Sequence, residues 1–368
     1  MRILHVSYSR AGGIGNVVSE LIKAQIQVGH NADWEFLTTG PLQGEALRHP
    51  VETLRAGLDD VALRDRNFQG PISSVRSGAI LARRVATKLN QYDVIHFHGG
   101  TLTLAPIADL GTSAKIVVSH HDMRLVTGAC HQSLGCNGYQ ENCSSCPALR
   151  SPFKQRAVQN RMESFPARWK HTAPSSRFAR LIGESSLLNG KSLTVVPNPL
   201  PEELVRFQPT GTNNEFLTIV GSSAASKLRR IPHDQLEKLS RLASRLGLKL
   251  ISIGGNAYEP SLVQNLGVLN RIQSFDLMSR SRLCMTPTKF ESFSSAGLEA
   301  LYLGAQLIAP LDSPQGELAE ELNLRFDMDD HGGHDANLEP RPSSQKHLFE
   351  NFGLNRVQQK FEEVYLDA

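Results

Sequence analysis

The sequence predicts an α/β protein of two domains, each a parallel β-sheet covered by helices on both faces. Its 368 residues exceed the roughly 100–200 residues of one ordinary domain. Short apolar runs alternate with amphipathic stretches along both halves, which is typical of such sheets. A cluster of prolines near residue 200 separates the halves. We therefore expect two Rossmann-like domains, residues 1–200 and 201–350.

In the first half, short apolar runs that end at glycines or polar turns predict strands, and apolar residues at helical spacing predict helices. The expected strands are Ile3–Tyr8, Asp33–Thr38, Asp93–His98 and Lys115–Ser119. The expected helices are Gly15–Gly29, Ile80–Leu89 and Leu102–Leu110. The same alternation continues through Ser175–Arg180 and Lys191–Pro197.

Three prolines in five residues, Pro197–Pro201, mark the domain boundary, because such a run fits neither a helix nor a central strand. Beyond it the alternation restarts. The expected strands are Glu215–Gly221, Lys249–Ile253, Leu283–Thr286 and Ala305–Ala309. The expected helices are Asp234–Leu246, Ser295–Leu303 and the amphipathic segment Val357–Leu366. Arg325–Gln345 is rich in Asp, His, Gly and Pro and is expected to be a surface loop.

Composition excludes several classes of protein. Apolar residues make up 40% and charged residues 20%, which excludes collagen-like, coiled-coil and wholly disordered chains. The net charge of +3 is too small to indicate a nucleic-acid-binding protein. We find neither a signal peptide nor a run of about 18 apolar residues that could span a bilayer. A cytoplasmic protein is expected.

The loop and helix start from Thr286 to Glu299 carry the strongest functional signal in the second half. Two carboxylates, Glu291 and Glu299, flank the small residues Ser294–Gly297 at a helix start. Unpaired backbone N–H groups and the helix dipole favour a phosphate there. The alternative is that Ser294 or Ser295 merely caps the helix and both glutamates are solvated.

This segment resembles the donor-binding signature of retaining glycosyltransferases of family four, which have the GT-B architecture of two domains across a cleft. The frame is Pro-x-x-x-Glu-x-Phe-x-x-x-x-x-Glu-Ala. Other segments resemble further motifs of that family in the same order: Gly12–Asn16, Asp93–His98, Val195–Pro199 and Phe352–Tyr365. The resemblance implies a closing helix, residues 351–368, that crosses back to the first domain.

Carried over by position, the resemblance makes Glu291 the contact to the donor-sugar hydroxyls and Glu299 the contact to the nucleotide ribose. The backbone of Phe293, Ser294 and Ser295 would receive the diphosphate, with Gly13 in the glycine-rich loop of the first domain. The family places an Arg and a Lys after the first glycine of the second domain. Here those positions hold Ser222 and Lys227.

The missing arginine matters because a positioned cation stabilises the leaving nucleoside diphosphate. Arg229 and Arg230 lie two and three residues beyond Lys227 and could take that role. The alternative is that the three cations form only a basic surface patch. The resemblance implies a mechanism of front-side attack, in which the donor phosphate takes the acceptor proton, and no catalytic metal is expected.

Histidines follow an expected strand in the first half. His121, with Asp122 after it, matches the position of a family histidine that faces the donor sugar, and His120 is the second choice. Together with His98, His120 and Asp122 are expected to line the acceptor side of the cleft. An imidazole there can donate to a sugar oxygen or stabilise charge near the anomeric carbon. The alternative is that these histidines are structural.

Four of the five cysteines lie within 17 residues, in an insertion at about residues 124–150. Cys130, Cys136, Cys143 and Cys146, with turn residues between them, provide the thiolates that a tetrahedral structural zinc requires. The alternatives are free buried cysteines, or two disulfides in an exported protein. A similar layout occurs in some polysaccharide-type transferases of family four.

The resulting hypothesis is a retaining glycosyltransferase of the hexosyltransferase type. It would move a sugar from a nucleotide diphosphate sugar to a glycan, a lipid-linked or a small hydroxylated acceptor, in polysaccharide biosynthesis. A lipid-linked acceptor would bring the cytoplasmic protein to the inner membrane face. The alternative is a non-catalytic binding subunit of GT-B shape, or another GT-B enzyme such as an epimerase or a phosphorylase. The sequence does not predict the donor base, the donor sugar, the acceptor or the oligomeric state.

Overall fold

The structure is a computed structural model of the chain. It describes residues 1–10, 12–38, 85–99, 112–128, 130–149, 152, 155, 159, 168–211, 214–221, 231–287, 290–310, 313–321 and 343–368. The chain divides into two compact units, one made of Met1–Pro199 with Leu354–Ala368, the other of Leu200–Gly353. The sequence places the boundary at residue 200 and starts the closing helix at 351, whereas the structure divides the chain after Pro199 and after Gly353.

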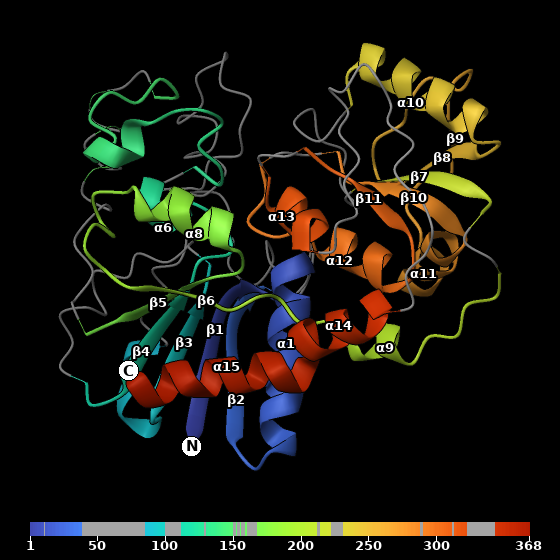
Figure 1. The fold of residues 1–368 in the computed structure, drawn as a ribbon. Coiled ribbons are helices and arrows are strands. Elements are labelled where there is room, and N and C mark those ends of the chain that lie inside the picture. The colour runs from blue at the N-terminus through green and yellow to red at the C-terminus, as the bar shows by residue number, and fades with distance from the viewer. Residues whose placement is uncertain are drawn as a thin grey trace. The chain divides into compact units, whose positions relative to one another are not determined.

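Unit 1 is built on a six-stranded parallel sheet with strand order β2-β1-β3-β4-β5-β6 (Figure 1). Its strands are β1 (Arg2–Ser9), β2 (Asn31–Thr38), β3 (Val94–His98), β4 (Lys115–Ser119), β5 (Lys170–Ala173) and β6 (Leu193–Val195). Its helices are α1 (Gly12–Gln27), α6 (Arg124–Thr127), α8 (Ser176–Gly183) and α15 (Leu354–Asp367), with 3-10 turns at Leu89–Gln91 and Gly138–Glu141.

The two faces of this sheet are covered by different parts of the chain. Helices α1 and α15 pack against each other and bury one face, where Leu21, Val117 and Phe361 belong to one apolar cluster. Phe178 of α8 and Tyr139 of the cysteine-containing segment belong to the cluster on the other face. Helix α15 therefore completes the core of unit 1.

Unit 2 is built on a five-stranded parallel sheet with strand order β11-β10-β7-β8-β9. Its strands are β7 (Phe216–Val220), β8 (Lys249–Ile253), β9 (Gln264–Asn265), β10 (Ser281–Met285) and β11 (Gln306–Ile308). Its helices are α9 (Glu202–Val205), α10 (His233–Arg245), α11 (Arg271–Ser279), α12 (Ser295–Tyr302), α13 (Pro314–Glu321) and α14 (Ser343–Phe352). Leucines of α10 cover one face, and α11, α12 and α14 cover the other.

The two-domain α/β prediction is confirmed, and the differences are local. Strands β5 and β9 and helices α11 and α13 were not expected from the sequence. Helix α14 begins at Ser343, so the end of the expected loop Arg325–Gln345 is helical. The expected helix Leu102–Leu110, the first half of the expected helix Ile80–Leu89 and the rest of that loop lie outside the described residues.

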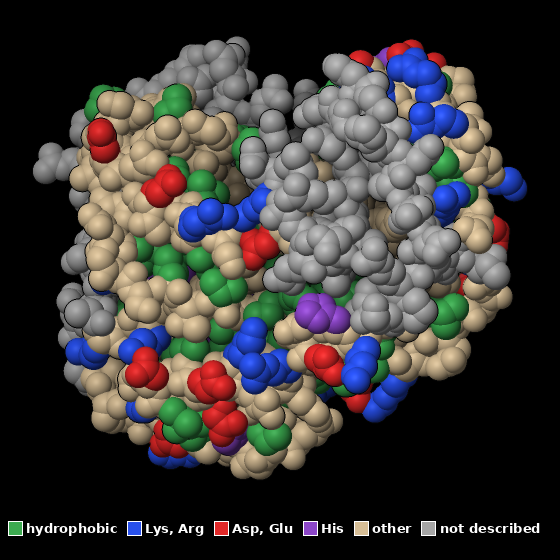
Figure 2. Space-filling view, viewed as in Figure 1, with side chains coloured by type: hydrophobic (Ala, Val, Ile, Leu, Met, Phe, Trp, Pro, Cys, Tyr) green, Lys and Arg blue, Asp and Glu red, His purple; other side chains and the backbone are tan. Residues whose placement is uncertain are grey.

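On the face shown in Figure 2, the described residues form no large patch of a single charge. Acidic and basic side chains are interspersed over α15 and the elements beside it. Among the helices that the structure describes, none combines the length and the apolar character needed to cross a membrane.

Candidate functional site

The turn between β1 and α1 brings backbone into close contact with itself. Gly12 has φ +82°, a conformation that suits glycine. A Cβ on Gly15 would lie 2.1 Å from the carbonyl oxygen of Arg10, so this position accepts no side chain. Gly13, the predicted donor contact, is exposed, and a Cβ there would meet nothing within 4 Å. The loop therefore requires glycine at 12 and 15, while position 13 is open.

The end of β3 lies against this loop and against the residues after β4. Gly99 has φ +71°, and a Cβ there would come within 3.3 Å of Ile14, 3.7 Å of Arg124 and 4.0 Å of Asp122. The carboxyl ends of parallel strands are where open α/β sheets bind ligands. The structure thus brings three sequence-distant segments together at the carboxyl edge of the sheet of unit 1.

His121 lies in this group and is paired with His98. The Nε2 atom of His121 is 3.2 Å from Nδ1 of His98, and the two rings stack with centroids 5.4 Å apart. The pKa of His121 is lowered to about 4, mainly by burial; Asp122 opposes this shift and Arg124 adds to it. The pKa of His98 lies well below 6.5 for the same reason of burial. Both rings are neutral at pH 7.

Asp122 is held by Arg124 in a buried ion pair. The Arg124 side chain donates through Nε to Oδ2 at 2.7 Å, and its backbone N–H donates to Oδ1 at 2.9 Å. Burial by itself raises the pKa of Asp122, but the charge and hydrogen bonds of Arg124 outweigh it, so the pKa is lowered. Asp122 is therefore a carboxylate that orients Arg124 beside His121.

His120 is separate from the pair of His98 and His121. Its Nε2 lies 3.1 Å from Nδ1 of His171 on β5. Burial lowers the pKa of His120 to about 4 and that of His171 to about 2. The structure therefore joins His98 to His121, and His120 to a strand residue that the sequence did not single out.

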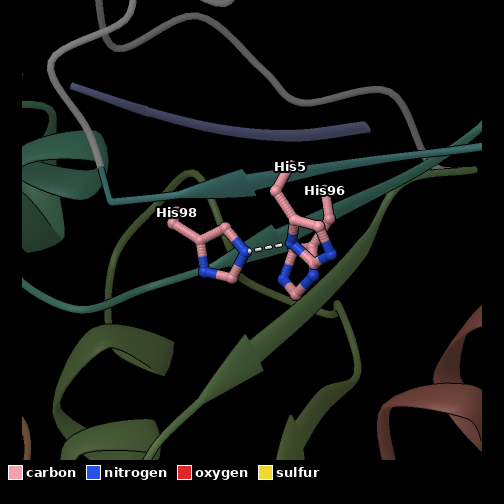
Figure 3. A group of neighbouring side chains, drawn as sticks. All are labelled: His5, His96 and His98. Atoms are coloured by element: carbon pink, nitrogen blue, oxygen red, sulfur yellow. Dashed lines mark hydrogen bonds between the residues drawn. The ribbon is translucent and has the colours of Figure 1, made fainter. Parts of the chain in front are cut away.

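Most of the polar residues that lie next to His98 and His121 inside unit 1 were not identified from the sequence. His5 on β1 and His96 on β3 are paired in register and share a face of the sheet with His98. The three rings lie together in Figure 3, and each has at least one nitrogen within 4.8 Å of the others. The signal was the spacing of His96 and His98, which puts both on one face of a strand.

In unit 2, the predicted phosphate-binding segment begins helix α12. Ser294 is the N-cap, and its hydroxyl accepts a hydrogen bond from the backbone N–H of Gly297 at 3.1 Å. A Cβ on Gly297 would lie 2.9 Å from Ser294 Oγ, so this turn needs glycine. Phe293 is buried against Phe352, with ring centroids 6.2 Å apart, whereas Ser295 is half-buried. The capping role of Ser294 is observed.

Glu299 is paired with an arginine of α11. Its Oε1 lies 3.3 Å from a guanidinium nitrogen of Arg271, whose guanidinium also lies over the ring of Phe275. Burial raises the pKa of Glu299, and Arg271 opposes the shift. Glu291, at the start of the same segment, is half-buried. The second carboxylate of the predicted donor loop is thus held in place by an ion pair inside unit 2.

A hollow of about 520 Å³ lies in unit 2 beside the start of α10. Ile231, Leu236 and Tyr258 contribute apolar surface, and His233 Nε2 lies 2.9 Å from Glu259 Oε2.

The predicted cations Lys227, Arg229 and Arg230, together with Ser222, lie outside the described residues.

The four clustered cysteines are free thiols in a turn-rich segment. Leu134, Asn142 and Cys143 have positive φ there. Burial, with a smaller contribution from the neighbouring thiols, raises the pKa of Cys130 and of Cys143 to about 12. Of the described residues, only His5, His96 and His98 bring three ligand atoms within 4.8 Å of one another. The thiols are therefore close neighbours without forming a closed metal sphere.

Comparison with known proteins identifies the fold. Neither a family model nor a curated protein sequence matches the chain. HepE of Anabaena in complex with UDP aligns over 100% of both chains, with a TM-score of 0.60 and 15% identity. Sucrose-phosphate synthase of Thermosynechococcus elongatus covers 100% of this chain with 98% of its own, at a TM-score of 0.59 and 11% identity.

A third solved structure is the catalytic domain of starch synthase IV from Arabidopsis thaliana, bound to ADP and acarbose. It covers 100% of this chain with 99% of its own, at a TM-score of 0.57 and 15% identity. HepE has also been solved with UDP and glucose and with UDP-glucose. The chain has the GT-B fold of two parallel-sheet α/β domains.

Proposed function

We propose that the protein is a glycosyltransferase that takes a sugar from a nucleoside diphosphate sugar and transfers it with retention to a hydroxyl acceptor. The observation that carries the proposal is the Glu291–Glu299 segment at the carboxyl end of β10, within a fold that matches nucleotide-sugar-binding enzymes over the whole chain. A glycan or lipid-linked acceptor in polysaccharide biosynthesis is the form that the sequence resemblance favours. A soluble saccharide primer is the simpler acceptor for a first assay.

In this proposal the donor occupies unit 2 through groups that are already fixed. Glu299 would accept hydrogen bonds from the ribose hydroxyls, since Arg271 holds its carboxylate in place. Glu291 would accept from the sugar hydroxyls, and the backbone N–H groups at the start of α12 would face the diphosphate. Donors placed where charge develops stabilise a leaving diphosphate without reorganisation.

A ligand screen followed by a transfer assay tests this proposal. UDP, GDP and ADP are added separately in a thermal-shift experiment, and one of them is expected to raise the Tm through binding to the folded state. The nucleoside diphosphate sugars of that base are then assayed for transfer. Glu291→Gln is expected to lower kcat/KM by roughly 10- to 150-fold, as loss of a hydrogen bond to a charged group would.

The matched control is Glu350→Gln, because Glu350 is an exposed carboxylate on α14 of the same unit. It is expected to leave kcat/KM unchanged. If no nucleotide shifts the Tm, or if Glu291→Gln leaves the turnover of every donor unchanged, the transferase proposal fails. A silent screen favours the non-catalytic GT-B-shaped subunit.

We also propose that the four clustered cysteines hold a structural zinc ion. The donor set of four thiols suits zinc and leaves no coordination position for water, and binding would draw the sulfur atoms closer together than they lie in the described residues. The backbone N–H of Gly138 already donates to Sγ of Cys136 at 3.4 Å, as N–H groups do to metal-bound sulfur. Metal analysis of the purified protein is expected to find one zinc per chain, and less than about half an equivalent contradicts the proposal.

A further inference from the structure

A line of hydrogen-bonded side chains runs through the core of unit 1, starting at His121. Nε2 of His121 contacts Nδ1 of His98 at 3.2 Å, and Nε2 of His98 contacts Nδ1 of His5 at 2.9 Å. Nε2 of His5 then contacts Oε1 of Gln25 on α1 at 2.7 Å. Figure 3 shows the central link between His98 and His5 as a dashed line. Four side chains from three strand regions and one helix are thus connected in sequence.

The line continues from Gln25 to helix α15 on the same face of the sheet. The amide nitrogen of Gln25 donates to the hydroxyl of Tyr365 on α15 at 3.1 Å, and this hydroxyl lies 2.8 Å from Nδ1 of His96. Nε2 of His96 contacts Ser119 Oγ at 2.7 Å, and Ser119 contacts Thr172 Oγ1 at 2.6 Å. Both nitrogens of His5, of His96 and of His98 therefore have a hydrogen-bond partner.

The four histidines of this line are neutral at pH 7, which makes their hydrogen bonds directional. Burial lowers the pKa of His5 and His121 to about 4 and that of His96 and His98 well below 6.5. A neutral imidazole has one N–H donor and one acceptor nitrogen. Once one nitrogen of a ring donates, the other must accept, so the direction of one bond fixes the next.

The direction of the line is decided at Gln25. Its carbonyl oxygen only accepts, so His5 must carry its proton on Nε2 and accept through Nδ1. His98 must then donate from Nε2 and accept through Nδ1, which leaves His121 to donate from Nε2. The distance of 2.7 Å between Nε2 of His5 and Oε1 of Gln25 lies within the usual range for a hydrogen bond from an N–H group to an oxygen. It therefore fits a Gln25 amide whose oxygen faces His5.

We propose that Gln25, acting through His5 and His98, is a positioning residue that holds His121 in the Nε2–H tautomer, so that Nδ1 of His121 is the acceptor. In the transferase proposed above, on which this consequence rests, His121 would accept a hydrogen bond from a hydroxyl of the sugar and would not donate one. The tautomer itself is a property of the folded protein and does not depend on the reaction.

A metal site at His5, His96 and His98 explains the same cluster less well. Their nitrogens are close enough together for one ion. However, His96 is bonded through both nitrogens to hydroxyl groups, and His5 and His98 are bonded to each other. Metal binding would break the link between His5 and His98 and at least one bond of His96. The hydrogen-bonded line satisfies all six nitrogens without an ion.

Long-range ¹H–¹⁵N correlation spectra of protein labelled with ¹⁵N-histidine test the proposal at pH 7, since they distinguish the two tautomers. Loss of its signals in His121→Gln assigns His121. The expected result is a single Nε2–H tautomer for His121. An Nδ1–H tautomer or a mixture overturns the proposal.

Two variants test whether Gln25 sets the direction of the hydrogen bonds along this line. Gln25→Met removes the acceptor of His5 at nearly constant volume and is expected to give a mixture of both His121 tautomers. The control Ser119→Ala deletes a hydrogen bond of the same network beyond Gln25 and is expected to leave His121 unchanged. Equal effects of the two variants overturn the role of Gln25. If Gln25→Met does not fold, the wild-type spectrum still decides the tautomer, and absence of transferase activity would not affect it.

Discussion

The two units of this protein hold the polar groups of their candidate sites in different ways. In unit 1, histidine, serine and threonine side chains of β1, β3, β4 and β5 are buried inside the sheet and hydrogen-bonded to one another. In unit 2, the carboxylates of interest lie on the α12 segment, and Glu299 keeps an arginine partner near the surface. Neutral groups can lie deep in a core if every donor and acceptor is satisfied, whereas a charge needs a partner or water.

The largest expected effect is that low pH destabilises unit 1 more than unit 2. Six histidines of unit 1, at positions 5, 96, 98, 120, 121 and 171, have lowered pKa values in the folded state; His121 is half-buried and the other five are buried. The unfolded chain takes up protons near pH 6.5, and the folded chain does not until about pH 4 or below. The stability is therefore complete above pH 6.5 and falls as the pH drops, by roughly 1.4 kcal/mol per pH unit for each histidine.

Tryptophan fluorescence measures this loss in unit 1 alone, because Trp34 and Trp169 are the only tryptophans of the chain. We expect the fluorescence transition at a higher pH than the remaining loss of circular dichroism, since the described histidines of unit 2, His233 and His347, are exposed. A single transition below pH 4 for both signals would remove the distinction between the units.

The glycine loop of unit 1 provides the next largest effect. Gly15→Ala places a Cβ 2.1 Å from a backbone oxygen that cannot move without shifting β1, and should cost about 3 kcal/mol of stability. Gly13→Ala is the matched control, because a Cβ there meets nothing within 4 Å. Urea denaturation followed by fluorescence compares the two variants. Equal losses would show that the close contact at Gly15 is not what the loop requires.

In unit 2, the ion pair of Glu299 offers a smaller effect. Arg271→Met removes the charge beside a largely buried carboxylate and should destabilise the protein by about 1–2 kcal/mol. It should also raise the pKa of Glu299 further and weaken nucleotide binding. Arg241→Met, at an exposed pair with 3.9 Å between charged atoms, should change stability by less than about 0.5 kcal/mol. Thermal denaturation with and without nucleotide measures both effects, and indistinguishable variants would contradict this role.

The smallest expected effect tests whether Ser294 only caps α12 or also contributes to phosphate binding. Ser294→Ala removes the observed cap and should cost about 1 kcal/mol, whereas Ser295→Ala should change stability by only a few tenths of a kcal/mol. Chemical denaturation gives the stabilities, and titration with the nucleotide gives the affinities. If Ser294→Ala lowers stability without changing nucleotide affinity, Ser294 acts as a cap only.

The strands and helices that the sequence predicted are those in which apolar residues recur along most of the segment. β1, β3, β4, β7, β8 and β10 were predicted because each is a short apolar run that ends at a glycine or a polar turn. β5 was missed because its residues, Lys170, His171, Thr172 and Ala173, are mostly polar, and a buried polar strand has no apolar signature. Its neighbours β4 and β6 supply the partners that make this strand stable.

The site was predictable only where neighbouring residues in the sequence act together. The Glu291–Glu299 segment and the cysteine cluster were visible as local motifs, and their roles stay predictions. The hydrogen-bonded line was not visible, because it joins His5, Gln25, His96 and Tyr365 across 360 positions of the chain. No spacing rule relates residues that only the sheet and helix α15 bring together.

The return of α15 to unit 1 also has a consequence for the order of events during synthesis. Unit 2 is inserted between Pro199 and Leu354, so the ribosome produces all of it before unit 1 has its last helix. Until then the sheet face that contains Ile3, Val94 and Val117 lacks Phe361 and Tyr365, which cover it in the finished protein. Unit 2 has all its segments earlier and can fold first, while the nascent unit 1 exposes an apolar face that invites chaperone binding.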